Sequence, residues 1–119
     1  MLVVGAGTIG VLAAIAAKAK GATVYISDVS EGKLEMAKEF GVDGTLLNDS
    51  PEHFDKRVAE LTEGNGFDVT IEAVGLPSTF QNCIDACCFR WTVSGLPYRY
   101  CSCCCCSFRR QRGHRHKIP

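Results

Sequence analysis

Short apolar runs alternate with longer amphipathic segments along the first 89 residues of the chain. The apolar runs predict strands at residues 2–4, 22–27, 45–47 and 67–74. The intervening segments have helical spacing and predict helices at residues 8–20, 31–40, 51–63 and from 77 onward. Regular alternation of strand and helix predicts an α/β fold, in which helices cover both faces of a parallel sheet.

The predicted helices carry start and stop signals. Ser30 and Ser50 stand where an N-cap side chain accepts a hydrogen bond from the first turn, and Pro51 fits the first helical position. Gly41 and Gly64 follow the last helical residues, as C-terminal glycines do. Right-handed crossovers then predict the strand order 3-2-1-4, which is an incomplete doubly wound (Rossmann) sheet with a crevice between strands 1 and 4.

Three glycines between the first strand and the first helix form the pattern Gly-x-Gly-x-x-Gly. Gly5 permits a tight turn, Gly7 lets the backbone approach a pyrophosphate because it lacks a Cβ, and Gly10 allows close packing of helix and strand. The N–H groups of Thr8, Ile9 and Gly10 then face phosphates at the positive end of the helix dipole. A plain turn also uses glycines, but the flanking strands and helix favour a dinucleotide site.

Asp28 ends the second apolar run, at the offset expected of the acid that holds the adenosine ribose. Its carboxylate can accept hydrogen bonds from the ribose hydroxyls. The same negative charge would repel the 2′-phosphate of NADP, so the sequence favours NAD. Domains that bind FAD or adenosylmethionine also use a glycine loop and an acid on the second strand, and they are alternatives at this point.

Four linked motifs resemble the medium-chain, zinc-type alcohol dehydrogenases, and within them the polyol (sorbitol) and threonine dehydrogenase branch. The motifs are residues 5–10 (GAGTIG), Asp28 with Lys33, residues 36–43 (MAKEFGVD) and residues 67–75 (FDVTIEAVG). The resemblance covers residues 1–89 and implies the NAD-binding domain of an oxidoreductase. The run at 67–75 argues against the FAD and adenosylmethionine alternatives.

The resemblance implies a role for each matched position. It assigns the pyrophosphate to the backbone of Thr8 and Ile9, the ribose to Asp28 with Lys33 beside it, and the nicotinamide side of the crevice to Val74 and Gly75. The activity it implies is hydride transfer between a secondary alcohol, such as a small polyol, and NAD. Members of this family are often homo-oligomers, so the resemblance also implies a homo-oligomer.

The resemblance places the zinc ligands and most of the substrate pocket in a catalytic domain that precedes the cofactor domain. This sequence begins at the first strand of the cofactor domain, so we expect no catalytic residue or metal ligand in it and little or no turnover from the chain alone. The family also has a fifth and a sixth strand, whose pattern is lost after Phe89, where at most residues 91–93 could mimic a strand edge. We therefore expect the fourth strand to form an exposed sheet edge.

The composition changes sharply at residue 89. Residues 1–89 hold all 13 acids and 6 of the 13 Lys and Arg, whereas residues 90–119 hold the other 7 basic residues and no acid. Five of the eight cysteines lie between Cys101 and Cys106. We interpret residues 1–89 as the NAD-binding domain and residues 90–119 as a separate Cys/Arg-rich tail.

The tail admits four interpretations: a thiolate metal site, a basic surface for nucleic acid, acylated cysteines at a membrane, or a shifted reading frame or exon boundary. Neighbouring residues of an extended chain point apart, which disfavours a metal site on consecutive cysteines. The simultaneous change in several residue types favours the frame or exon boundary, with residues 96–119 disordered. The alternative function is a non-catalytic nucleotide-binding module with a basic interaction tail.

The remaining reactive side chains have structural explanations. Cys83, Cys87 and Cys88 fall in the fourth predicted helix, where buried packing is more common than metal binding. His53 is expected on a solvated helix surface. The first 17 residues lack charge but also lack the basic segment of a signal peptide, and the lysines that follow interrupt a membrane span, which predicts a cytosolic protein.

Overall fold

The computed structural model describes the backbone of residues 1–95 and the side chains of residues 1–88. Strands and helices alternate throughout this part, as predicted. The elements are β1 (Leu2–Val4), α1 (Thr8–Ala19), β2 (Tyr25–Asp28), α2 (Glu31–Glu39), β3 (Gly44–Leu47), α3 (Pro51–Thr62), β4 (Phe67–Glu72), α4 (Pro77–Ala86) and β5 (Cys87–Gly95).

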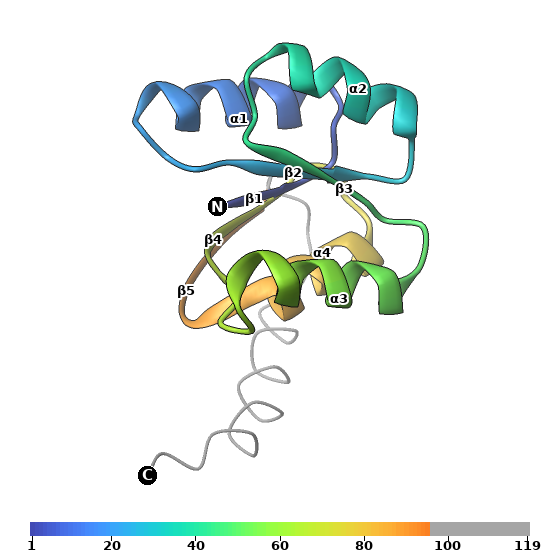
Figure 1. Ribbon diagram of the computed structural model, residues 1–119, viewed down its shortest axis with the longest axis vertical. Coiled ribbons are helices and arrows are strands. Elements are labelled where there is room, and N and C mark those ends of the chain that lie inside the picture. Colours follow the sequence, from blue (N-terminus) through green and yellow to red (C-terminus); the bar gives the residue numbers. More distant parts are fainter. Residues whose placement is uncertain (96–119) are drawn as a thin grey trace, which may run out of the picture.

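All the strand pairs are parallel, and the strand order is β3-β2-β1-β4-β5. The predicted α/β class and the predicted order of the first four strands are therefore confirmed. Figure 1 shows α1 and α2 on one face of the sheet and α3 and α4 on the other. The sheet is thus enclosed between two layers of helix, which is the doubly wound arrangement.

The expectation that β4 would form a sheet edge was wrong, because β5 pairs with it along its outer side. The fourth helix ends at Ala86, and Cys87, which we expected inside the helix, begins β5 and pairs with Phe67. Pairing resumes where Val69 meets Thr92, so β5 contains an irregularity. The sequence after Cys87 is rich in aromatic and β-branched residues, which favour strands even though it lacks the family's glycine-led pattern.

The two faces of the sheet hold separate hydrophobic clusters, because successive side chains of a strand point to opposite faces. Leu2 and Val4 of β1 belong to the cluster under α3 and α4, and Val3 belongs to the cluster under α1 and α2. Gly10 and Ala14 are the buried residues of α1, as the small side chains of this helix predict.

The two predicted N-caps differ in the structure. Ser50 Oγ accepts a hydrogen bond from the backbone N–H of His53 at 3.3 Å, and Pro51 occupies the first turn of α3. Ser30 occupies the N-cap position of α2 without a side-chain cap. Its backbone N–H is instead held by Asp28, as shown below. Among the described residues, no helix is long and apolar enough to cross a membrane.

Candidate functional site

Three predicted site segments meet at the carboxyl ends of the parallel strands. Gly5 follows β1, Asp28 ends β2, and Val74 lies just beyond the end of β4. The strand register places Val4 beside Ser27 on one side and beside Glu72 on the other. The connections that follow β1 and β4 lead to opposite faces of the sheet, since α1 and α4 cover opposite faces (Figure 1). This is the switch point at which doubly wound sheets bind ligands.

The turn after β1 requires glycine at its first position. Gly5 has a φ of 110°, a backbone conformation that residues other than glycine rarely adopt. A Cβ at Gly5 would lie 2.6 Å from Cγ2 of Val74 and 3.1 Å from the carbonyl oxygen of Ala73. The backbone N–H of Gly5 also donates to the carbonyl of Ser27 at 2.7 Å. The turn is therefore clamped between β2 and the segment after β4.

Gly10 and Gly7 meet different surroundings. A Cβ at Gly10 would lie 1.8 Å from the carbonyl oxygen of Gly5, so only glycine fits the first turn of α1 here. Gly7 is the N-cap of α1, and no atom lies within 4 Å of the position that its Cβ would take. The loop is therefore closely packed on its inner side and open at Gly7.

The N-terminus of α1 is exposed in the part of the chain that the structure describes. Thr8 and Ile9 are exposed, and the first N–H groups of a helix have no partner within it. The first turn contains no acidic residue, and the N-cap makes no side-chain hydrogen bond. The positive end of the helix dipole is therefore not neutralised by a carboxylate of the helix itself.

Asp28 organises the backbone around it. Its Oδ2 accepts a hydrogen bond from the N–H of Ala6 at 2.9 Å, and its Oδ1 accepts one from the N–H of Ser30, also at 2.9 Å. Each carboxylate oxygen can accept about two hydrogen bonds, so one acceptor site on each remains for a ligand hydroxyl. Lys33 is exposed in the first turn of α2, and its place beside a ribose stays a prediction.

Glu72 was not predicted as a site residue. Its side chain is only 4% exposed at the end of β4. Its Oε1 accepts hydrogen bonds from the N–H groups of Val74 and Gly75 and from Oγ1 of Thr79, each at 2.8 Å. The available signal was an acid at the end of an apolar run, directly before a glycine-containing turn.

Exposed apolar side chains also lie near the carboxyl ends of these strands. Val29, directly after Asp28, is 74% exposed, and Val74 and Leu76 are 46% and 54% exposed. Ile9, at the start of α1, is 51% exposed. Apolar groups at the rim of a polar loop are suited to contact the faces of flat rings.

The other reactive side chains lie elsewhere. Cys83 belongs to the core, as predicted, and burial raises the pKa of its thiol far above the ordinary value, so it stays protonated. His53 is a half-exposed surface residue of α3 whose Nδ1 lies 2.6 Å from Asp49. No group of three or more His, Cys, Asp or Glu among the described residues is placed to hold a metal ion.

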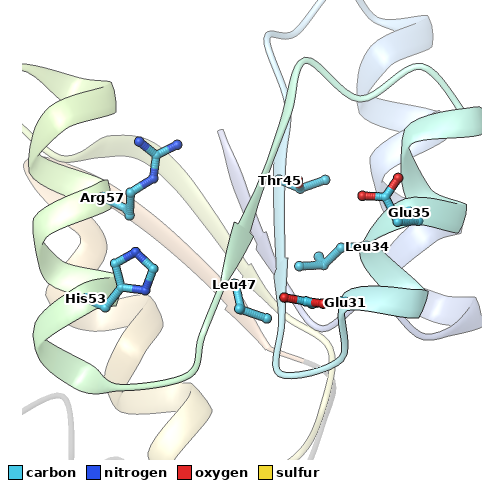
Figure 2. A pocket seen from close by; sticks show the side chains of 7 residues that line it. All are labelled: Glu31, Leu34, Glu35, Thr45, Leu47, His53 and Arg57. Atoms are coloured by element: carbon cyan, nitrogen blue, oxygen red, sulfur yellow. The ribbon is translucent and has the colours of Figure 1, made fainter.

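A separate open cleft of about 420 Å³ crosses the edge strand β3. Figure 2 shows its two walls: His53 and Arg57 come from α3, and Glu31, Leu34 and Glu35 come from α2, with Thr45 and Leu47 of β3 between them. Arg57 pairs with Glu60 at 2.8 Å, and Glu35 pairs with Lys38 at 2.5 Å. These ion pairs within single helices give the cleft no set of convergent groups, and no predicted site residue lines it.

A sequence profile described as zinc-binding dehydrogenase matches residues 8–94. The chain belongs to this family. The L-threonine 3-dehydrogenase of Klebsiella pneumoniae is 44% identical over 86 residues, which cover 71% of this chain and 25% of that protein. The L-threonine 3-dehydrogenase of Escherichia fergusonii is 42% identical over the same length and with the same coverage.

Solved structures agree with this assignment. The zinc-dependent alcohol dehydrogenase 2 of Streptococcus pneumoniae superposes with a TM-score of 0.75 at 32% identity, over 81% of this chain and 28% of that one. An alcohol dehydrogenase of Thermotoga maritima gives a TM-score of 0.75 at 26% identity, over 84% and 29% of the two chains. The resemblance predicted from the sequence is confirmed. The chain spans about a quarter of the length of the curated relatives it matches.

The different surroundings of Gly10 and Gly7 give a test of the loop. Gly10→Ala should lower the free energy of unfolding by about 1–3 kcal/mol or more, because the added methyl overlaps the Gly5 carbonyl. Gly7→Ala should change it by less than about 1 kcal/mol, since its φ of −76° suits alanine and the space is open. Urea denaturation followed by circular dichroism measures both. Equal losses in the two variants would contradict the described loop geometry.

Proposed function

We propose that this chain supplies the NAD-binding part of a dehydrogenase that transfers a hydride between a secondary alcohol and NAD. The observation that carries the proposal is the convergence of an open glycine loop at a helix N-terminus with a carboxylate that retains free acceptor sites. Membership of the zinc-binding dehydrogenase family supports the same conclusion.

The loop fits a pyrophosphate on three grounds. Gly7 leaves open space at the N-cap of α1, where the backbone can approach a ligand. The N–H groups of Thr8 and Ile9 are placed to donate to phosphate oxygens, and the helix dipole favours the negative charge. Gly5 and Gly10 pack against neighbouring atoms on the inner side of the loop, where there is no room for a side chain.

The end of β2 fits an adenosine ribose. The two oxygens of Asp28 are each engaged by one backbone N–H and can still accept a hydroxyl. A phosphate on the 2′ position would bring negative charge against this carboxylate, which disfavours NADP. Lys33, in the exposed first turn of α2, would lie beside the ribose.

The segment after β4 would line the nicotinamide side of the crevice. Val74 is half-exposed there, and Gly75 has a φ of 90°, which keeps this turn free of a side chain. When bound, NAD supplies the ring carbon that accepts the hydride. The described residues position the cofactor and exclude water from one side of it.

The described residues do not fit zinc, because they contain no group of three or more potential ligands. We therefore assign no zinc ligand or catalytic residue to them. The similarity to L-threonine 3-dehydrogenases supports a secondary alcohol as substrate, since the 3-hydroxyl of threonine is one. The basic tail of the alternative binding-module function lies outside the described residues.

Asp28→Ala tests the cofactor assignment. The variant should bind NAD about tenfold more weakly, because ribose hydrogen bonds to a charged group are lost. It should also narrow the preference for NAD over NADP, because the repulsion of the 2′-phosphate is removed. Calorimetric titration with both cofactors measures the two affinities. Asp28 also holds the loop at Ala6, so weaker binding alone is ambiguous, and an unchanged NAD/NADP ratio would contradict the proposed role.

A second prediction concerns turnover. The purified chain should bind NAD yet form no detectable NADH from threonine or sorbitol in the presence of zinc, since no described ligand group can place the metal beside an alcohol. The absorbance of NADH provides the readout, and NAD binding in the same sample is the control for correct folding. Zinc-dependent oxidation that a chelator abolishes would show that the chain carries its own catalytic site.

A further inference from the structure

The segment after β4 depends on one buried side chain. Glu72 is 4% exposed, and it lies on the face of β4 that also carries Thr70, since residues two apart in a strand point to the same face. A buried carboxylate is costly unless several donors satisfy it. Here two donors, the N–H groups of Val74 and Gly75, belong to the turn that follows, and the third, the hydroxyl of Thr79, belongs to α4.

We propose that Glu72 is a positioning residue for the cofactor: its carboxylate fixes the Val74–Gly75 turn against the glycine loop. This inference rests on the proposed NAD-binding function and adds to it a residue whose hydrogen bonds go to the Val74–Gly75 turn and to Thr79.

The first step is the hold on the turn itself. The N–H groups of Val74 and Gly75 both point to one oxygen of Glu72, at 2.8 Å each. Hydrogen bonds from N–H groups to an ionised acceptor are about twice as strong as those between neutral groups. Two successive backbone groups are thus tied to the end of the strand, and the positive φ of Gly75 lets the chain turn there.

The second step links this turn to α4. Thr79 Oγ1 lies 2.8 Å from Oε1 of Glu72 and 2.9 Å from the carbonyl oxygen of Leu76, so both are acceptors for its one proton. It also lies 3.3 Å from the backbone nitrogen of Leu76, from which it can accept. Leu76 is the N-cap of α4. The carboxylate therefore fixes both the turn and the start of the helix that follows it.

The third step links the turn to the phosphate loop. Cγ2 of Val74 lies 2.6 Å from the position that a Cβ would take on Gly5, so Val74 packs directly over the first glycine. The N–H of Ala73 donates to the carbonyl of Val4 at 2.9 Å and anchors the start of the turn to β1. A displacement of Val74 would therefore change the lining of the crevice on its nicotinamide side.

Glu72→Gln is the main test, because glutamine keeps the size of the side chain but replaces the charged acceptor with a neutral amide. NAD binding should weaken about tenfold, and amide hydrogen exchange at Val74 and Gly75 should accelerate by a similar factor. Thr79→Val leaves Glu72 intact and removes one of its three donors, so it should produce a smaller weakening of the same kind.

Thr70→Val is the matched control. Thr70 is also buried on β4, and its Oγ1 donates to the carbonyl of Cys83 at 3.1 Å and lies 3.3 Å from Sγ of Cys87, so the variant loses buried hydrogen bonds without touching the turn. It should lower the melting temperature yet leave the NAD affinity within about twofold of the wild type. All variants are measured in the full chain at a temperature where each is folded.

The outcomes separate the two proposals. Loss of NAD affinity in Glu72→Gln with retention in Thr70→Val supports the positioning role, whereas equal losses in both, or wild-type binding in Glu72→Gln, overturn it. If the wild-type chain fails to bind NAD, the proposed function falls and the cofactor role of Glu72 falls with it. If amide hydrogen exchange at Val74 and Gly75 is unchanged in Glu72→Gln, the carboxylate does not fix the turn, and the proposal is overturned whatever the NAD affinity.

Discussion

The close approach of Gly5 and Gly10 is the constraint on which the rest of the site depends. The carbonyl oxygen of Gly5 occupies the space that a Cβ on Gly10 would need, at 1.8 Å. The chain can therefore leave β1, reverse its direction and enter α1 within a few residues only if both positions lack a side chain. This turn aims the N-terminus of α1 at the crevice and leaves Gly7 open on the outer side.

Two carboxylates use the same device on either side of this turn. Asp28 ends β2 and accepts the N–H groups of Ala6 and Ser30, and Glu72 ends β4 and accepts those of Val74 and Gly75. Backbone groups at the end of a strand would otherwise lack partners, and each acid satisfies two of them. The two differ in burial. Asp28 is half-buried and retains acceptor sites for a ligand, whereas Glu72 is enclosed and is engaged by the turn and by the hydroxyl of Thr79.

The sequence predicted the features that local patterns determine. Alternation of apolar runs and helical spacing predicted the α/β class and the order of the first four strands, and the glycine spacing located the turn after β1. Ser50 and Pro51 predicted the start of α3, because both act through their immediate neighbours.

Features that depend on tertiary pairing were not predictable in the same way. Cys87 continues the helical spacing of α4, yet it pairs with Phe67, because the free side of β4 offers a ladder of hydrogen bonds that helical spacing does not register. The role of Glu72 was missed for a related reason. Two of its three partners are backbone N–H groups, which leave no trace in the residue types of the turn, and the third, Thr79, lies seven residues further along the chain. The interpretation of residues 96–119 lies outside the described residues, and the boundary at residue 89 stays a prediction.

The central claim is that the crevice at the carboxyl ends of β1 and β4 binds NAD. A titration of the isotope-labelled chain with NAD, followed by amide chemical shifts, tests it residue by residue. The account predicts the largest shifts at Thr8, Ile9, Gly10 and the Val74–Gly75 turn, with saturation at one affinity. Shifts confined to the cleft over β3, around His53 and Arg57, or no shifts at all, would contradict it.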